Sequence, residues 1–182
     1  MLPKAAEPTL ITGRLILRPF RASDLQPYAA MNADPDVMRY LGGPISRAET
    51  ERQMILANQT WSKSRLGKIA IAHQTDGAFL GMCGLSFEHW YPDDLELGWR
   101  LAPQYWGKGF ATEAAFAWLD YGYATLKAHR IISITDVPNQ RSIAVMERIG
   151  MIFDHAKTLD ADGDIFDVVI YRHDRPAENQ RT

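Results

Sequence analysis

A chain of 182 residues, 46% hydrophobic and 23% charged, is long enough to bury the core of one globular domain without disulfides or metal ions. No apolar run approaches the roughly 20 residues of a membrane span, and the single cysteine, Cys83, excludes an internal disulfide. The net charge of −2 argues against nucleic acid as a partner, because phosphate contacts need a surplus of Lys and Arg.

Neither a targeting signal nor a metal site is visible. The first residues lack the basic and apolar segments of an export signal, so we expect a cytoplasmic protein that binds no membrane. The five histidines are scattered, and none pairs with another or with Cys83 at the short spacings of zinc sites. No metal cofactor is expected.

The first half of the chain predicts a strand, two short helices and a hairpin. Residues 9–19 are rich in β-branched and aliphatic side chains, which is typical of a strand. A helix is expected over residues 25–31, and Ser46 with Glu49 predicts a capping box that opens a second helix to about residue 63. Residues 66–75 and 78–88 predict antiparallel strands joined by a tight turn.

A strictly alternating segment follows at residues 95–101. One face carries Leu95, Leu97, Trp99 and Leu101, and the other carries Glu96, Gly98 and Arg100. After a glycine-rich turn, helical spacing predicts one packed face made of Ala111, Ala115, Leu119, Tyr123 and Leu126.

The rest of the chain predicts a strand over residues 131–137, a helix between the cap candidates Asn139 and Gly150, and two strands over 151–158 and 165–173. The expected fold is α/β, with a mixed, mostly antiparallel twisted sheet and flanking helices. Residues 9–174 form the single domain, between an N-terminal segment (1–8) and a polar tail (175–182).

Residues 104–111, with the sequence Gln-Tyr-Trp-Gly-Lys-Gly-Phe-Ala, join a predicted strand to a predicted helix. Such a turn places backbone N–H groups around an anion at the positive end of the helix dipole. Gly107 and Gly109 remove side chains that would keep a diphosphate away, and Lys108 adds a positive charge. The ligand should be a phosphate ester, although a glycine pair used only for packing explains the same residues.

The spacing disfavours two other phosphate-binding turns. A nucleoside-triphosphate loop needs glycine at Ala102 and Ser or Thr at Gly109. A dinucleotide fingerprint needs a small residue at Thr112 and belongs to an early βαβ unit, whereas antiparallel strands come first here.

The pattern Gln104-x-x-Gly107-x-Gly109-x-Ala111 resembles the signature by which GNAT acetyltransferases hold the pyrophosphate of acetyl-CoA. Asn139-x-x-Ser142, followed by residues 148–151, resembles the next segment of that superfamily. The opening residues 14–19 are similar to the branch of ribosomal-protein alanine and serine N-acetyltransferases. The resemblance covers residues 9–173 and implies a GNAT fold, with the sheet splayed between its fourth and fifth strands.

The resemblance also implies an acyltransferase that uses acetyl-CoA as cosubstrate, with the pantetheine arm in the splay and the diphosphate on the glycine turn. The residues expected to bind the coenzyme are Trp99, Arg100, Leu101, Gln104, Trp106, Gly107, Lys108, Gly109, Phe110, Ala111, Thr112, Asn139 and Ser142. Asn139 is equally explained as a helix cap, and the two roles are compatible.

Acetyl transfer needs a base for the amine, donors for the oxyanion and a proton for the thiolate. Glu96 is the candidate base, because it lies beside the expected thioester; a solvent-facing glutamate is the alternative. Many members of the family supply the proton from a tyrosine at the position of Met146, so Ser142 is the nearest candidate hydroxyl here. Ser142 also fits a purely structural role in the first helical turn.

The acceptor is expected to be a peptide N-terminal α-amine or a small-molecule amine, and the protein a monomer or homodimer. Glu88, Asp93, Asp94 and Glu96 suggest an acidic mouth for a cationic acceptor, or only a charged loop. Trp61, Trp90 and Tyr91 fit an acceptor pocket or core packing. The main rival function is a coenzyme A-binding module without turnover; a dinucleotide-dependent oxidoreductase is disfavoured.

Overall fold

The computed structural model describes residues 10–161 and 163–175, and within them the strands form one eight-stranded sheet in the order β1-β2-β3-β4-β5-β6-β8-β7. The strands are β1 (Leu10–Ile11), β2 (Leu15–Arg18), β3 (Gly67–His73), β4 (Phe79–Glu88), β5 (Tyr91–Leu101), β6 (Arg130–Asp136), β7 (Ile152–Ala161) and β8 (Asp164–Asp174). The predicted segment 1–8, Asp162 of the last turn and residues 176–182 of the predicted tail lie outside the described residues.

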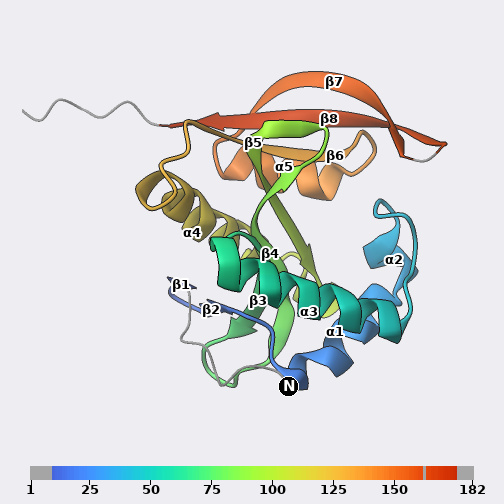
Figure 1. Cartoon of the computed structure of the whole chain (residues 1–182), viewed down its shortest axis with the longest axis vertical. Coiled ribbons are helices and arrows are strands. Elements are labelled where there is room, and N and C mark those ends of the chain that lie inside the picture. The colour runs from blue at the N-terminus through green and yellow to red at the C-terminus, as the bar shows by residue number, and fades with distance from the viewer. Residues whose placement is uncertain (1–9, 162, 176–182) are drawn as a thin grey trace, which may run out of the picture.

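Helices cover both faces of this sheet (Figure 1). They are α1 (Leu25–Asn32), α2 (Pro35–Met38), α3 (Arg47–Ser64), α4 (Phe110–Ala124) and α5 (Gln140–Arg148), with two short 3-10 turns at Ala22–Asp24 and Pro103–Tyr105. Ser46 caps α3 by accepting a hydrogen bond from the Glu49 amide at 3.1 Å, as its sequence position predicts.

Two apolar clusters lie on opposite faces of the sheet. On one face, Leu97 and Leu101 of β5 pack with Trp118 of α4 and Met146 of α5. On the other face, Ala70 and Met82 pack with side chains of α1, α2 and α3. The alternation of β5 therefore directs its leucines toward α4 and its polar residues toward the α1–α3 side.

The sheet divides between β5 and β6, the only parallel pair among the described strands (Figure 1). Their pairing covers Leu95 with Ile131 and Glu96 with Ile132 and then stops. Just beyond it, the buried Ser133 hydroxyl donates to the Leu97 carbonyl at 2.6 Å. The mixed sheet and its splay between the fourth and fifth predicted strands are confirmed.

The structure differs from the sequence prediction at three places. The described part of the predicted strand 9–19 forms two antiparallel strands, because the chain turns between them, where the Thr12 N–H donates to the Leu15 carbonyl at 3.0 Å. Asp34 begins an unpredicted helix, α2, by accepting a hydrogen bond from the Asp36 amide. The buried face of α4 is rotated from the predicted one: Ala115 and Leu119 belong to it, but its other members are Phe110, Ala114, Trp118 and Gly122.

Candidate active site

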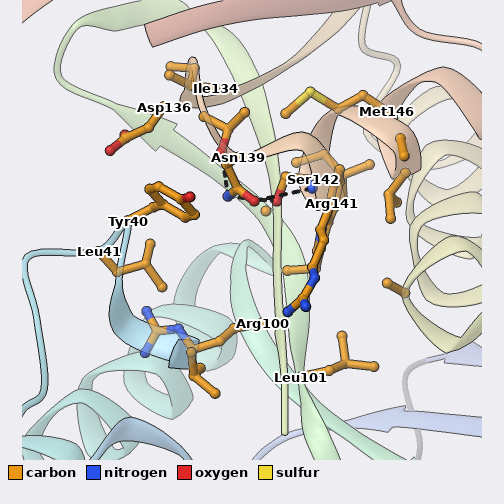
Figure 2. Close-up of a pocket in the computed structure, with 18 of the residues that line it drawn as sticks. Tyr40, Leu41, Arg100, Leu101, Ile134, Asp136, Asn139, Arg141, Ser142 and Met146 are labelled. Atoms are coloured by element: carbon orange, nitrogen blue, oxygen red, sulfur yellow. Dashed lines mark hydrogen bonds between the residues drawn. The ribbon is translucent and has the colours of Figure 1, made fainter. Parts of the chain in front are cut away.

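The splay opens into a cleft of about 1480 Å³ lined by β5, β6, α2, α5 and the start of α4. The glycine turn closes one end, and residues 36–41 with parts of β7 and β8 border the other. Figure 2 shows Tyr40 and Leu41 facing Asn139 and Ser142 across this space. The cleft therefore has two halves, which we call the turn half and the α2 half.

The glycine turn has the backbone geometry that its residues predict. Gly107 and Gly109 have φ angles of 72° and 78°, a region that side-chain-bearing residues rarely adopt. No atom lies within 4 Å of a Cβ built at Gly107. Gly109 is the N-cap of the 15-residue helix α4, whose first N–H groups have no partner within the helix. The turn therefore presents an open, electropositive backbone to the cleft.

Hydrogen bonds from the first strands hold this turn and the start of α4 in place. Glu113 accepts hydrogen bonds from the Thr12 hydroxyl at 2.5 Å and from Arg14 Nε at 2.6 Å, and Arg14 also donates to the Lys108 carbonyl at 3.1 Å. Partial burial alone raises the pKa of Glu113, but these hydrogen bonds outweigh it, and the net pKa is lowered. Glu113 thus remains an ionised anchor between the first strands and α4.

Most of the residues predicted to bind the coenzyme line the cleft. Gln104 and Lys108 do not, and Lys108 extends over the Tyr105 ring. The others are Trp99, Arg100, Leu101, Trp106, Gly107, Gly109, Phe110, Ala111, Thr112, Asn139 and Ser142.

The backbone of Trp99 faces the opening between the strands. The Leu97 carbonyl is bonded by Ser133, and the Leu101 carbonyl by Trp106 Nε1 at 2.8 Å, so both point toward the β6 side. Because alternate residues of a strand direct their N–H and C=O groups to the same edge, those of Trp99 point there too. They are suited to bond an extended amide chain inserted between β5 and β6.

Arg141 is a cleft residue that the sequence reading missed. It lies in the first turn of α5, and its guanidinium carbon is 4.5 Å from the centre of a Trp106 ring. Figure 2 shows the side chain extending from α5 into the space between Ser142 and Leu101. It adds a positive charge to the turn half, where an anionic coenzyme would enter.

Glu96 is buried on the cleft and paired with Lys68, another residue that the sequence did not reveal. Lys68 Nζ lies 2.8 Å from Glu96 Oε2 and 3.2 Å from Glu88 Oε1. The contact between Lys68 Nζ and Glu96 Oε2 is an ion pair between a partly buried ammonium group and a buried carboxylate. Gly98 makes room for the lysine stem, which a Cβ there would meet at 2.5 Å.

Burial by itself lowers the pKa of Lys68, but the charges of Glu96 and Glu88 outweigh this and raise the net pKa. Lys68 is therefore an ammonium ion at neutral pH. The alternative of a solvent-facing Glu96 is wrong, since only 7% of this residue is exposed.

Asn139 and Ser142 meet at the start of α5 (Figure 2). Asn139 Oδ1 accepts a hydrogen bond from the Ser142 amide at 3.3 Å, and Asn139 Nδ2 donates to the Ser142 hydroxyl at 3.1 Å. The asparagine is thus a helix cap, and the serine oxygen is already used as an acceptor while its proton is free for another partner. Met146 lines the same wall with a hydrocarbon and sulfur surface.

The acidic mouth predicted from four carboxylates is wrong. Asp94 pairs with Arg130 at 2.6 Å, and neither Asp93 nor Asp94 lines the cleft. Glu88 and Glu96 line it, but both contact Lys68.

The three aromatic residues considered for an acceptor pocket separate in the structure. Trp90 lines the cleft, with its ring centre 6.3 Å from that of Phe166. Trp61 packs in the core against Trp118, and Tyr91 contacts His155 outside the cleft lining. Only Trp90 keeps the position of a pocket residue.

The described residues show neither a metal cluster nor a membrane-spanning helix. No three His, Cys, Asp or Glu side chains within residues 10–161 and 163–175 are grouped so that they could hold a metal ion. Over the same ranges, every helix is too short or too polar to cross a bilayer.

The family model for the acetyltransferase (GNAT) domain matches residues 14–152. The protein YkkB of Bacillus subtilis is 34% identical over 149 residues, which cover 80% of this chain and 86% of that protein. An acetyltransferase structure from Agrobacterium tumefaciens is 29% identical, covers 96% of this chain and 99% of its own, and has a TM-score of 0.78. The fold is also shared with a spermidine N-acetyltransferase from Vibrio cholerae in complex with CoA and spermine, at 22% identity over 89% of this chain and 96% of that one, with a TM-score of 0.71.

These matches define an enzyme that transfers acyl groups. The chain belongs to the GNAT acetyltransferase family, and its cosubstrate is acetyl-CoA. The resemblance to the GNAT family is therefore confirmed. The chain is also similar to the putative ribosomal N-acetyltransferase YdaF of Bacillus subtilis, at 30% identity over 107 residues, which cover 59% of this chain and 58% of that protein. A RimL structure at 18% identity shares the fold, with a TM-score of 0.78. The turn half has an open backbone and the Arg141 charge, both of which suit an anionic group.

Proposed function

We propose that this enzyme moves the acetyl group of acetyl-CoA to a primary amine by direct attack, with both substrates bound at once. The observation that supports this most strongly is the position of the buried Glu96 at the base of the splay. It lies on the face of β5 opposite the leucines that pack on α4. A coenzyme on the glycine turn and an amine in the α2 half would meet beside it.

The chemistry requires few side chains. The amine nitrogen attacks the thioester carbon, the C–S bond breaks, the nitrogen loses a proton and the coenzyme leaves as a thiolate that is then protonated. The backbone N–H of Trp99 is our candidate oxyanion donor, because it faces the opening. The Ser142 hydroxyl is the candidate proton donor, since its oxygen is occupied by Asn139 while its proton is free.

Glu96 would accept the amine proton, directly or through water. Because Lys68 already contacts this carboxylate, an acceptor ammonium must compete with a lysine for it. That competition favours amines of low basicity, such as an α-amine with a pKa near 8, over a lysine ε-amine near 10. A peptide N-terminus or a small-molecule α-amine fits the site best.

Named acceptors among the relatives are diverse. Matches include spermidine N(1)-acetyltransferase of Escherichia coli, at 26% identity, and a fungal FsC-acetyl coenzyme A-N(2)-transacetylase, at 29% identity. These proteins act on different amines, so membership of the family does not select one for this chain.

A coenzyme-binding protein without turnover is the alternative, and Met146 favours it, because methionine cannot donate the proton that tyrosine supplies in many relatives. The two functions separate in two assays. Thermal shifts with CoA, acetyl-CoA and NAD should show stabilisation by the first two alone. Thiol release over a panel of peptides, amino acids, polyamines and aminoglycosides should then show turnover; coenzyme binding with no turnover on any amine would leave the binding function.

A further inference from the structure

One charge in the α2 half has no counter-charge. Arg100 lies on β5, on the same face as Glu96, and lines the cleft. Its NH1 group donates to Asn32 Oδ1 at 2.7 Å, and its Nε is buried without a hydrogen-bond partner in the described structure. No carboxylate of residues 10–161 or 163–175 forms an ion pair with this half-buried arginine, whereas a charge removed from water is normally paired.

A relay of neutral groups fixes the orientation of this guanidinium. Asn32 is completely buried, and its amide donates to the Thr50 hydroxyl at 3.2 Å, which in turn donates to the Ser46 carbonyl at 3.0 Å. Asn32 therefore offers its oxygen to Arg100 in one orientation only. Burial lowers the pKa of Arg100, as expected for a cation taken out of water without an anion to compensate it.

The direction of the side chain separates it from the coenzyme. Figure 2 shows Arg100 extending from β5 toward Leu41, away from Asn139, Ser142 and Met146. The glycine turn and Arg141 provide for a diphosphate at the other end of the cleft. An anion at Arg100 would therefore belong to the second substrate.

The charges around Arg100 indicate which net charge the second substrate should carry. Lys68, Glu96 and Glu88 form one cluster with a net charge of −1, and Arg100 supplies one positive charge. On the rim, Asp36 and Arg39 pair with each other, and Asp136 adds one carboxylate. This nearly balanced half does not suit a polycation. It suits a molecule with an amine at one end and a single negative charge at the other.

We infer that the acceptor is an amine that also carries a carboxylate, and that Arg100 binds this carboxylate. The inference rests on the proposed acetyl transfer. A single planar guanidinium matches a carboxylate, which it can bind through two N–H groups, better than a doubly charged phosphate. Glu96 Oε1 lies 3.2 Å from the place that a Cβ at Gly98 would take, and Arg100 lies two residues beyond Gly98, or about 7 Å along the strand. An amine beside the Glu96 carboxylate and a carboxylate at Arg100 are therefore separated by several bonds.

The test uses matched acceptors on the full chain. Glycine peptides from glycylglycine to tetraglycine, whose α-amines have pKa values near 8, serve as amino carboxylates and are compared with their C-terminal amides and with diamines of equal length, by thiol release with saturating acetyl-CoA. We expect the best amino carboxylate to exceed its diamine and amide by at least tenfold in kcat/KM. Arg100→Met should bring this ratio close to one, and Arg100→Lys should restore part of it. Arg52→Met, which removes an exposed arginine of α3 outside the cleft, should keep the full ratio.

A direct measurement of acceptor binding tests the role of Arg100 independently of turnover. Calorimetry of the same amino carboxylates, with the protein saturated by CoA, should show binding that Arg100→Met weakens at least tenfold, while circular dichroism and CoA affinity report that the variant is folded. Binding without turnover would support the carboxylate site and contradict the proposed reaction. Equal rates for amides and carboxylates, or binding indifferent to Arg100→Met, would overturn the inference.

Discussion

The two halves of the cleft present different chemical groups to their ligands. The turn half presents main-chain N–H groups, shaped by Gly107 and Gly109 and by the start of a long helix. The α2 half presents the side-chain charges of Lys68, from β3, and of Glu96 and Arg100, both from β5. In the function proposed above, the donor is held mainly by main-chain groups, whereas the acceptor is selected by side chains. Each substitution below breaks one half and leaves the other intact.

The largest effect is expected at the turn. Gly107→Val should weaken acetyl-CoA binding at least a hundredfold, because a branched side chain would occupy the surface that the diphosphate approaches. The positive φ costs about 1–2 kcal/mol of stability, which equilibrium unfolding in urea would report. Gly77→Val is the matched control: its φ is 71° and its surroundings are equally empty, but it lies outside the cleft lining. If both variants lost the same affinity, strain rather than the turn surface would be the cause.

Glu96→Gln tests the carboxylate at the base of the splay. We expect kcat to fall by about two orders of magnitude, most strongly at low pH, where fewer acceptor amines are unprotonated, with little change in the KM for acetyl-CoA. Glu88→Gln is the control, because Glu88 contacts the same Lys68 Nζ but lies farther from it. A pH profile of Glu96→Gln parallel to that of the wild type would reduce Glu96 to a positioning residue.

Lys68→Met tests the ion pair through stability. Removing the ammonium leaves Glu96 buried without its partner, which should cost about 2 kcal/mol of unfolding free energy at pH 7. The folded pKa of Lys68 is raised, so its contribution is complete below the unfolded value of about 10.4 and declines only at higher pH. Urea unfolding of wild type and variant from pH 6 to pH 11 measures this. A difference that disappeared below pH 9 would contradict the pairing.

The smallest effect concerns Asn139, for which a helix cap and a cofactor contact are both possible. Asn139→Ala should lose about 1 kcal/mol of stability, the usual value for a lost N-cap. Asn139→Ser should keep most of the stability, because serine also caps helices. If acetyl-CoA affinity stays constant in both variants, the residue is a cap alone; a loss in the serine variant would reveal contact with the coenzyme.

The comparison also explains what the sequence could predict. Most strands, the glycine turn and the cap at Asn139 depend on residues close together in the chain. Apart from the segment 9–19, the predicted bounds of the strands lie within about four positions of the observed ones. The buried face of α4 was misplaced, because Gly122 packs closely on Ile131 of a neighbouring strand and rotates the helix. Local spacing carries no information about such a contact.

The charge contacts of the α2 half could not be predicted from the sequence for the same reason. Lys68 reaches Glu96 from β3 across the whole width of β4, and Arg100 is held by Asn32 from α1. The sequence suggests that Asp94 belongs to an acidic mouth, but in the structure its carboxylate forms an ion pair with Arg130. Charges close in sequence were separated by the fold, and charges distant in sequence were brought together.

The Ser133 hydroxyl has a consequence for the reaction coordinate. It satisfies the Leu97 carbonyl at the position where a further rung of the β5–β6 ladder would form, and it is 1% exposed. The Ser133 oxygen thereby limits how far the pairing of β5 with β6 extends before the splay begins. One additional rung would shift the point of separation by about 3.3 Å along the strands. In the reaction proposed above, such a shift would move the thioester carbon away from Glu96, so that the Ser133 hydroxyl would set the distance between the two.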